Sequence, residues 1–278
     1  MHDLPSYTPD VGACRVAYIN NSTNTVTFGA EHQYYSAGYG QLNAVAFDPN
    51  LNKFINAYSI GANATVNAIT LVIDSSTNTI SSGTSVQVAT GFGASMGYGP
   101  QIVYNSTAQK FVIVYTKSGG AGIAAVTASI TDSTNAVVLG AITDFDGSFY
   151  PEITEGANST VYVASRGGDG SNASSYQQLT INGTNLTSGG VNTYHNHATV
   201  QAAYNAVIYV GGRLTIVVDY YDIASAAMYL YTFSFERAIQ PATPYFVNFD
   251  GSIVSISSDK TLPMGTGLNS TTIFTKGV

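Results

Sequence analysis

Residues 133–140, Ser-Thr-Asn-Ala-Val-Val-Leu-Gly, decide the fold, because relatives of this stretch recur along the chain. The relatives are residues 22–29 (Ser-Thr-Asn-Thr-Val-Thr-Phe-Gly), 76–83 (Ser-Thr-Asn-Thr-Ile-Ser-Ser-Gly) and, one residue shorter, 183–189 (Gly-Thr-Asn-Leu-Thr-Ser-Gly), with a degenerate copy at 236–240. A period of about 50 residues in a sequence of short strands is typical of propeller blades.

Each copy is predicted to be a polar turn followed by a strand. Asn supplies the turn, because its side chain bonds the local backbone and it tolerates left-handed conformations. The glycine that ends each copy permits a bulge or a close approach of another backbone. We therefore expect four glycines to occupy equivalent places in the outer strands: Gly29, Gly83, Gly140 and Gly189.

Short alternating segments between the turns indicate four strands in each repeat. The second unit shows them most clearly, at residues 101–104, 110–115, 123–130 and 137–143. Two strands precede the first full unit and match strands three and four of a repeat. The tail supplies matches to strands one and two, at residues 252–256 and 271–275.

The two partial units complete one another, so the sequence predicts an all-β, five-bladed β-propeller with four-stranded antiparallel blades. Ring closure by two strands from each terminus would remove two raw sheet edges. We expect a single domain over residues 1–278. Its predicted parts are a shared closing blade (1–38 plus 251–278) and full blades at about 42–93, 100–146, 150–197 and 198–250.

Composition excludes several classes of protein. Charged residues make up 9% of the 278, and the net charge of −7 repels phosphate backbones, so nucleic acid is not an expected partner. The one cysteine, Cys14, has no internal partner for a disulfide. No apolar run approaches the roughly 20 residues of a membrane span. The first residues lack the basic and apolar regions of a signal peptide.

An aromatic residue or histidine precedes each predicted inner strand. These residues and a nearby acid form the candidate binding set: Tyr39, Tyr98, Tyr150, His195 and Asp250. Rigid, amphipathic tyrosines suit contacts with sugars or protein surfaces. The alternative is that these rings plug the channel or pack between blades.

Hydrolysis needs two or three acids that converge on the axis. The acids nearest to the starts of inner strands are Glu152 and Asp250, with Asp144 and Asp146 in a loop. The chain lacks the Asp at the start of the first inner strand that is found in arabinanase- and fructosidase-like families. His195 and His197 supply half of a metal site without a clear third ligand. We therefore expect no catalytic residues, no metal and no cofactor.

The inner strand pairs at residues 43–58 and 100–115 resemble a propeller-like repeat in structural proteins of tailed phages, notably marine phages and cyanophages. The resemblance implies a tail fibre, spike or other virion surface component. Phage fibres usually carry a long N-terminal attachment segment, whereas blade strands begin here almost at once.

The resulting prediction is a non-enzymatic structural or adhesion module on the surface of a virion, present in several copies. Its expected partners are other virion proteins and host-surface glycans. A free glycan-binding lectin and a five-bladed glycoside hydrolase are the alternatives.

Overall fold

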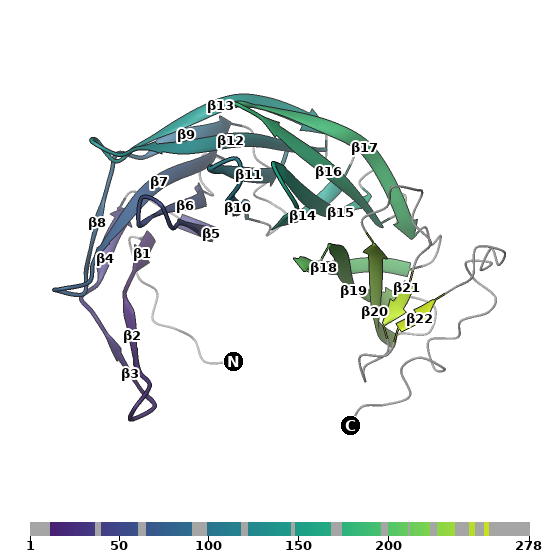
Figure 1. Ribbon diagram of the computed structural model, residues 1–278, viewed down its shortest axis with the longest axis horizontal. Helices are drawn as coiled ribbons and strands as arrows, with labels where there is room; N and C mark the ends of the chain where they lie inside the picture. Colours follow the sequence, from purple (N-terminus) through teal and green to yellow (C-terminus); the bar gives the residue numbers. More distant parts are fainter. Residues whose placement is uncertain are drawn as a thin grey trace. The chain divides into compact units, whose positions relative to one another are not determined.

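The computed structural model of the chain contains only β-strands as regular elements in the part that it describes (Figure 1). This part comprises residues 12–36, 40–60, 65–90, 99–117, 122–145, 148–167, 174–195, 200–210, 212–222, 227–236, 245–247 and 253–255. The predicted all-β class is confirmed. Within these ranges, no helix is present that could cross a membrane.

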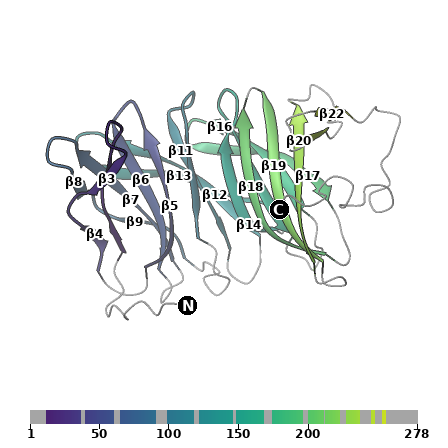
Figure 2. The same cartoon turned by 90° about the horizontal axis from the view of Figure 1, so that it is seen from below.

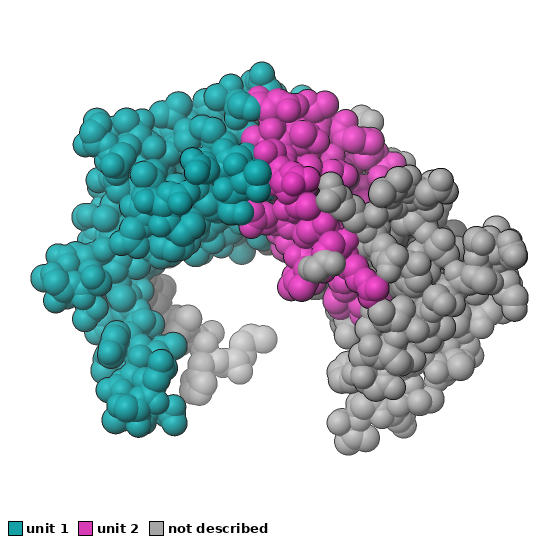
Figure 3. Space-filling view, in the orientation of Figure 1, with its two compact units in different colours: residues 1–119, 124–144, 183–186 teal, residues 120–123, 145–182, 187–278 magenta. Residues whose placement is uncertain are grey.

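The chain divides into two compact units, which are coloured separately in Figure 3. The first contains residues 1–119, 124–144 and 183–186, and the second contains residues 120–123, 145–182 and 187–278.

Four short strands at the N-terminus form two antiparallel pairs. β1 (Gly12–Cys14) pairs with β4 (His32–Tyr35), and β2 (Ala17–Asn20) pairs with β3 (Thr25–Phe28). β1 and β2 together take the place of one longer strand, and β3 and β4 together take the place of its antiparallel partner. The sequence predicted these two strands without their interruptions.

The first complete sheet contains five strands: β5 (Gly40–Asp48), β6 (Lys53–Ile60), β7 (Thr65–Asp74), β8 (Thr79–Ser82) and β9 (Val86–Thr90). β8 and β9 both pair with β7, so together they serve as the fourth strand of the repeat. The break between them begins at Gly83, the glycine of the repeated stretch.

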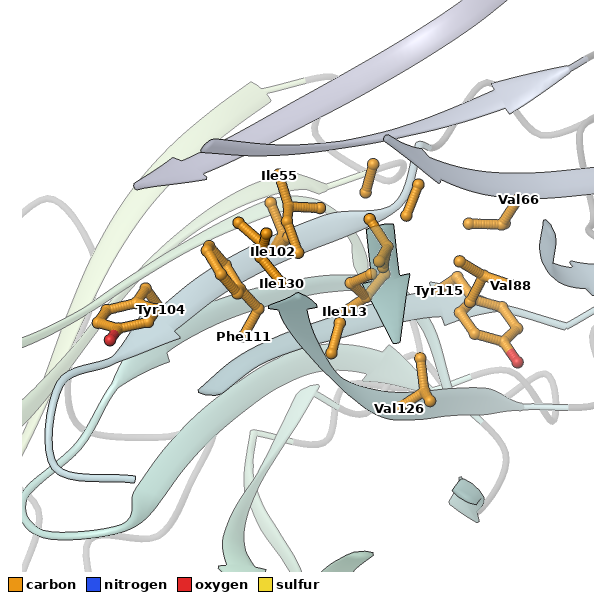
Figure 4. Packing of buried hydrophobic residues seen from close by; sticks show 14 of the residues in the cluster. Ile55, Val66, Val88, Ile102, Tyr104, Phe111, Ile113, Tyr115, Val126 and Ile130 are labelled. Carbon is orange, nitrogen blue, oxygen red and sulfur yellow. The ribbon is translucent and has the colours of Figure 1, made fainter. Parts of the chain in front are cut away.

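The second sheet has the predicted four strands in sequence order: β10 (Gln101–Asn105), β11 (Lys110–Thr116), β12 (Ile123–Thr131) and β13 (Ala136–Phe145). Apolar side chains of this sheet pack against those of the first complete sheet (Figure 4). Ile55 and Val66 from one sheet and Phe111 and Ile113 from the other are fully buried in this cluster. Burying such side chains contributes about 1.5–3 kcal/mol each.

The repeated turns have the backbone conformation that the sequence predicted. Asn24, Asn78 and Asn135 lie at φ of 52°, 54° and 54°, in the left-handed region. Asn adopts this conformation more readily than most other residues with a side chain.

The glycines of the repeat accommodate the turn of the following repeat. A Cβ on Gly29 would overlap the carbonyl oxygen of Asn78, and one on Gly83 would overlap that of Asn135. A Cβ on Gly140 would likewise overlap the carbonyl oxygen of Thr184. The absence of a side chain therefore permits a close backbone approach at three successive repeats.

Gly189 has no such close neighbour among the described residues. The turn of the following repeat, at residues 236–240, lies mostly outside them, so the equivalence of all four glycines stays a prediction. The nearest atom to a Cβ on Gly189 would be the carbonyl oxygen of Gln178, at 3.4 Å, which is an ordinary contact. The fourth copy is shorter, and its turn places Gly183 at φ 64° instead of an Asn.

The second unit contains two further sheets, whose strands are labelled in Figures 1 and 2. The third sheet consists of β14 (Ser148–Glu155), β15 (Thr160–Gly167), β16 (Ser174–Asn182) and β17 (Asn185–His195). The fourth consists of β18 (Val200–Val210), β19 (Arg213–Asp222), β20 (Ala227–Glu236), β21 (Tyr245–Val247) and β22 (Ile253–Ser255). β22, which the repeat pattern assigns to the closing blade, pairs with β21.

Candidate active site

Two of the five residues in the predicted binding set fall within the described part of the chain. Tyr150 lies in β14, and His195 is the last residue of β17. Tyr39, Tyr98 and Asp250 lie outside the described residues. The predicted aromatic binding face therefore stays a prediction.

Tyr150 lies in a β-bulge of the inner strand β14. The pairing with β15 shifts register between Phe149 and Glu152, and Tyr150 has φ 58°. β5 of the first sheet has a similar shift beside Leu42, at φ 43°. Positive φ is rare for bulky residues, and bulges often lie next to active sites, where they redirect a side chain. In β14 the ladder resumes at Glu152.

Register shows which position of the repeat Glu152 occupies. It pairs with Ala164, the fifth residue of β15, which in turn pairs with Tyr176 of β16. Directly paired residues project from the same face of a sheet, so Glu152 and Tyr176 lie on one face with only a methyl group between them.

The residues at the equivalent positions of the first complete sheet are apolar. Ala57, the fifth residue of β6, pairs with Ala44 and Ala68. All three belong to or pack against the hydrophobic core between the first and second sheets. Glu152 and Tyr176 thus occupy positions at which the first sheet has alanines, whereas the second sheet has Gln101 at the position of Glu152.

Ser174 is a third polar residue on this face. It pairs with Arg166, and the corresponding pair of the first sheet is Ser59 and Val66. Val66 is a fully buried core residue, and Ser174 is also 0% exposed. The Ser174 hydroxyl is buried without a hydrogen-bond partner. Such a group costs about 1–3 kcal/mol of desolvation.

The polar face, defined as Glu152, Ser174 and Tyr176, is the side of the third sheet that meets the fourth sheet. Tyr162, two residues before Ala164 and therefore on the same face, stacks on Tyr209 of β18 with ring centroids 5.3 Å apart. The site is therefore built within the second unit.

Burial changes the acidity of two of these groups. It raises the pKa of the Glu152 carboxyl from 4.5 to about 7, because a half-buried carboxylate loses hydration. Burial also raises the pKa of the Tyr176 phenol. At neutral pH, Glu152 is consequently present in both protonated and ionised forms, which suits a group that transfers protons.

The other candidate acids differ from Glu152. Asp144 forms an ion pair with Lys117 at 3.0 Å. Asp48 accepts hydrogen bonds from the backbone N–H groups of Asn50 and Leu51 and thereby stabilises a turn. Asp146 and Asp250 lie outside the described residues.

No metal centre is evident in the part of the chain that the structure describes. Its side chains include no group of three or more His, Cys, Asp or Glu residues that could hold an ion. His197, half of the predicted metal pair, falls outside that part.

Comparisons with known proteins relate the chain to others by fold alone. No protein-family model matches it, and no curated protein matches its sequence. Among solved structures, a candidate 6-phosphogluconolactonase from Bacteroides fragilis has a TM-score of 0.55 at 11% identity, over 87% of this chain and 76% of that one. This likeness places the chain among β-propellers.

Two further structures are similar to a lesser degree. An exo-β-1,3-galactanase from Phanerochaete chrysosporium has a TM-score of 0.47 at 12% identity, over 90% of this chain and 67% of that one. An α-L-arabinofuranosidase from Fusarium graminearum has a TM-score of 0.46 at 9% identity, over 78% and 68% of the two chains.

The prediction of a non-enzymatic virion module requires correction. The similar structure with a TM-score of 0.55 is named as a candidate 6-phosphogluconolactonase, which is an enzyme and not a virion component. The resemblance to phage proteins, the virion location and the expected partners stay predictions.

Proposed function

We propose that this protein hydrolyses glycosidic bonds and that Glu152 is its general acid. The observation that carries the proposal is a half-buried carboxyl with a pKa of about 7, directly after a β-bulge and at a position where the first sheet has the partly buried Ala44. A glycosidic oxygen leaves readily only when it is protonated, and a carboxylic acid of raised pKa supplies that proton at neutral pH.

The surroundings of Glu152 support this role. The bulge at Tyr150 sets where the ladder resumes and hence how Glu152 is presented. Tyr176 adds a phenol ring to the same row, and aromatic rings pack against the apolar faces of sugars. Hydrolysis also needs a second carboxylate, to activate water or to attack the sugar. Asp146 and Asp250 remain the predicted candidates for that group.

The test is the pH dependence of turnover on a panel of 4-nitrophenyl glycosides. Because a general acid acts in its protonated form, kcat is expected to fall as the pH rises through about 7, the pKa of Glu152. A kcat that stayed constant from about pH 6 to about pH 9 would contradict the assignment of Glu152 as the acid.

We also propose that the sheets close into a five-bladed ring. In the N-terminal strands, Asn20 pairs with Thr25 beside the first turn, just as Asp74 pairs with Thr79 beside the second. This correspondence supports their assignment as the third and fourth strands of a blade. In this proposal residues 252–256 and 271–275 supply the missing first and second strands, which requires residues 253–255 to separate from β21, with which they pair in the structure.

Deleting residues 270–278 is expected to expose a sheet edge and to promote aggregation, because no disulfide replaces the closure. Light scattering of the truncated and full-length chains at equal concentration measures this. Hydrogen exchange supplies the control: residues 17–20 are expected to lose protection on truncation, whereas residues 110–116 keep theirs. Unchanged protection at residues 17–20 would refute this closure.

A further inference from the structure

The polar face contains more polar groups than general acid catalysis requires. Relative to the first sheet, three core positions have become polar together: Ala44 corresponds to Glu152, Val66 to Ser174 and Ala68 to Tyr176. Polar residues also replace apolar ones on the opposite face, where Ser165 stands at the position of Tyr58 and Gln177 at that of Ile69. Ser165 and Gln177 have hydrogen-bond partners, Ser175 and Ser188, whereas Ser174 has none.

Ser174 is unfavourable for stability as it stands. Its hydroxyl is buried without a partner at a site where the first sheet has a well-packed valine. The next residue shows the usual arrangement: Ser175 projects from the opposite face, and its hydroxyl lies 3.1 Å from that of Ser165 in a buried hydrogen bond. A buried hydroxyl in a protein interior normally has such a partner.

We infer that Ser174 and Tyr176 form a binding subsite for a neutral sugar unit next to Glu152. This inference rests on the proposed function. Ser174 offers one hydroxyl to a sugar hydroxyl, and Tyr176 offers a ring to the apolar face of the sugar. Glu152 and Arg166, which pairs with Ser174 in the ladder, are of opposite charge, so no net charge favours an anionic or a cationic ligand. Because Ser174 has no exposed surface, the sugar reaches it only by displacing the atoms that cover it.

The variant Ser174→Val separates binding from structure. It restores the residue that the first sheet has at the equivalent position, Val66, and it removes an unpaired buried hydroxyl. We therefore expect Tm to be unchanged or raised. Loss of one neutral hydrogen bond is expected to weaken sugar binding about threefold to tenfold.

The measurement is titration of 4-nitrophenyl glycosides into Glu152→Gln protein with and without Ser174→Val. Calorimetry reports the affinity whether or not the glycoside is turned over. The matched control is Ser175→Val, which leaves the Ser165 hydroxyl without its partner. It is expected to lower Tm and to leave sugar affinity unchanged.

Two results would overturn the inference: equal affinities with and without Ser174→Val, or no binding of any glycoside in the panel. The proposed function fails separately, when wild-type turnover proves to be independent of Glu152. Weaker binding in Ser174→Val together with normal Glu152-independent turnover would support the subsite and refute the acid.

Discussion

Glu152→Gln is expected to lower kcat on a glycoside substrate by roughly 10²–10⁴-fold, the contribution of a positioned general acid. Glutamine has nearly the same shape as glutamic acid but has no proton to donate to a leaving oxygen. KM is expected to change little, because the sugar contacts assigned to Ser174 and Tyr176 remain. Steady-state kinetics of the two proteins at about pH 6, where wild-type Glu152 is mostly protonated, measures the effect.

The matched control is Glu155→Gln, three residues further along β14. Successive residues of a strand alternate between faces, so Glu155 projects from the face opposite Glu152. Its replacement by glutamine is expected to leave kcat within about twofold of wild type. Equal losses in the two variants would indicate a general disturbance of β14, and full activity of Glu152→Gln would exclude Glu152 as the acid.

Glu152→Gln is also expected to change how stability depends on pH. The pKa of Glu152 in the folded chain, about 7, lies above its ordinary value of 4.5. The folded state therefore binds more protons than the unfolded state between these values, and the free energy of unfolding falls as the pH rises through this window. The loss is complete and constant only well above pH 7, where the folded carboxyl is also ionised.

The glutamine variant lacks this ionisation. A fully sealed carboxyl would lose about 3 kcal/mol, and solvent screening of a half-buried one reduces this to about 1–2 kcal/mol. Glu152→Gln should therefore match the stability of wild type near pH 4 and exceed it near pH 8 by about that amount. Urea unfolding at the two pH values measures the difference, and a constant difference at both would contradict the raised pKa.

Gly140→Val is expected to destabilise the chain by at least about 1–3 kcal/mol. A Cβ at this position would overlap the carbonyl oxygen of Thr184 and the hydroxyl of Thr127. The Thr184 carbonyl also accepts hydrogen bonds from the Thr127 hydroxyl at 2.7 Å and from the Ala141 N–H at 3.3 Å. The valine would force these groups apart, so packing and hydrogen bonding are lost together. Denaturant unfolding at fixed pH reports the change.

Gly189 provides the control for this substitution, because no atom of the described residues comes as close to its Cβ direction. Its nearest neighbour in the Cβ direction is 3.4 Å away. Gly189→Val is expected to change stability by less than about 0.5–1 kcal/mol. Similar losses in both variants would show that the approach of the Thr184 carbonyl is not the cause.

Local turn chemistry made much of the architecture predictable from the sequence. The Ser-Thr-Asn stretches marked turns, and Asn24, Asn78 and Asn135 have the left-handed backbone expected of them. The break between β8 and β9 could not be predicted, because alternating polarity continues through Gly83 into the next segment. The interruption depends on which carbonyl approaches Gly83, and that is a property of the neighbouring repeat.

The candidate site was only partly predictable. Glu152 drew attention as an acid near the start of an inner strand, but its raised pKa depends on burial that the sequence does not reveal. Ser174 and Tyr176 lie in a segment rich in Ser, Tyr and Gln, where neither stands out. They become conspicuous only when register aligns them with Val66 and Ala68 of the first sheet.

The contact between each glycine and the following turn also bears on how such a chain lengthens during evolution. A main-chain carbonyl lies close to each of three glycines: that of Asn78 to Gly29, that of Asn135 to Gly83 and that of Thr184 to Gly140. The contact between neighbouring repeats therefore depends little on the identity of the side chains. A duplicated segment of about 50 residues would contain both parts of this contact, the glycine and the turn whose carbonyl approaches it. Side chains elsewhere could then differ between copies, as Glu152, Ser174 and Tyr176 differ from their counterparts in the first sheet. The new copy would still pack against its neighbours through the glycine contact.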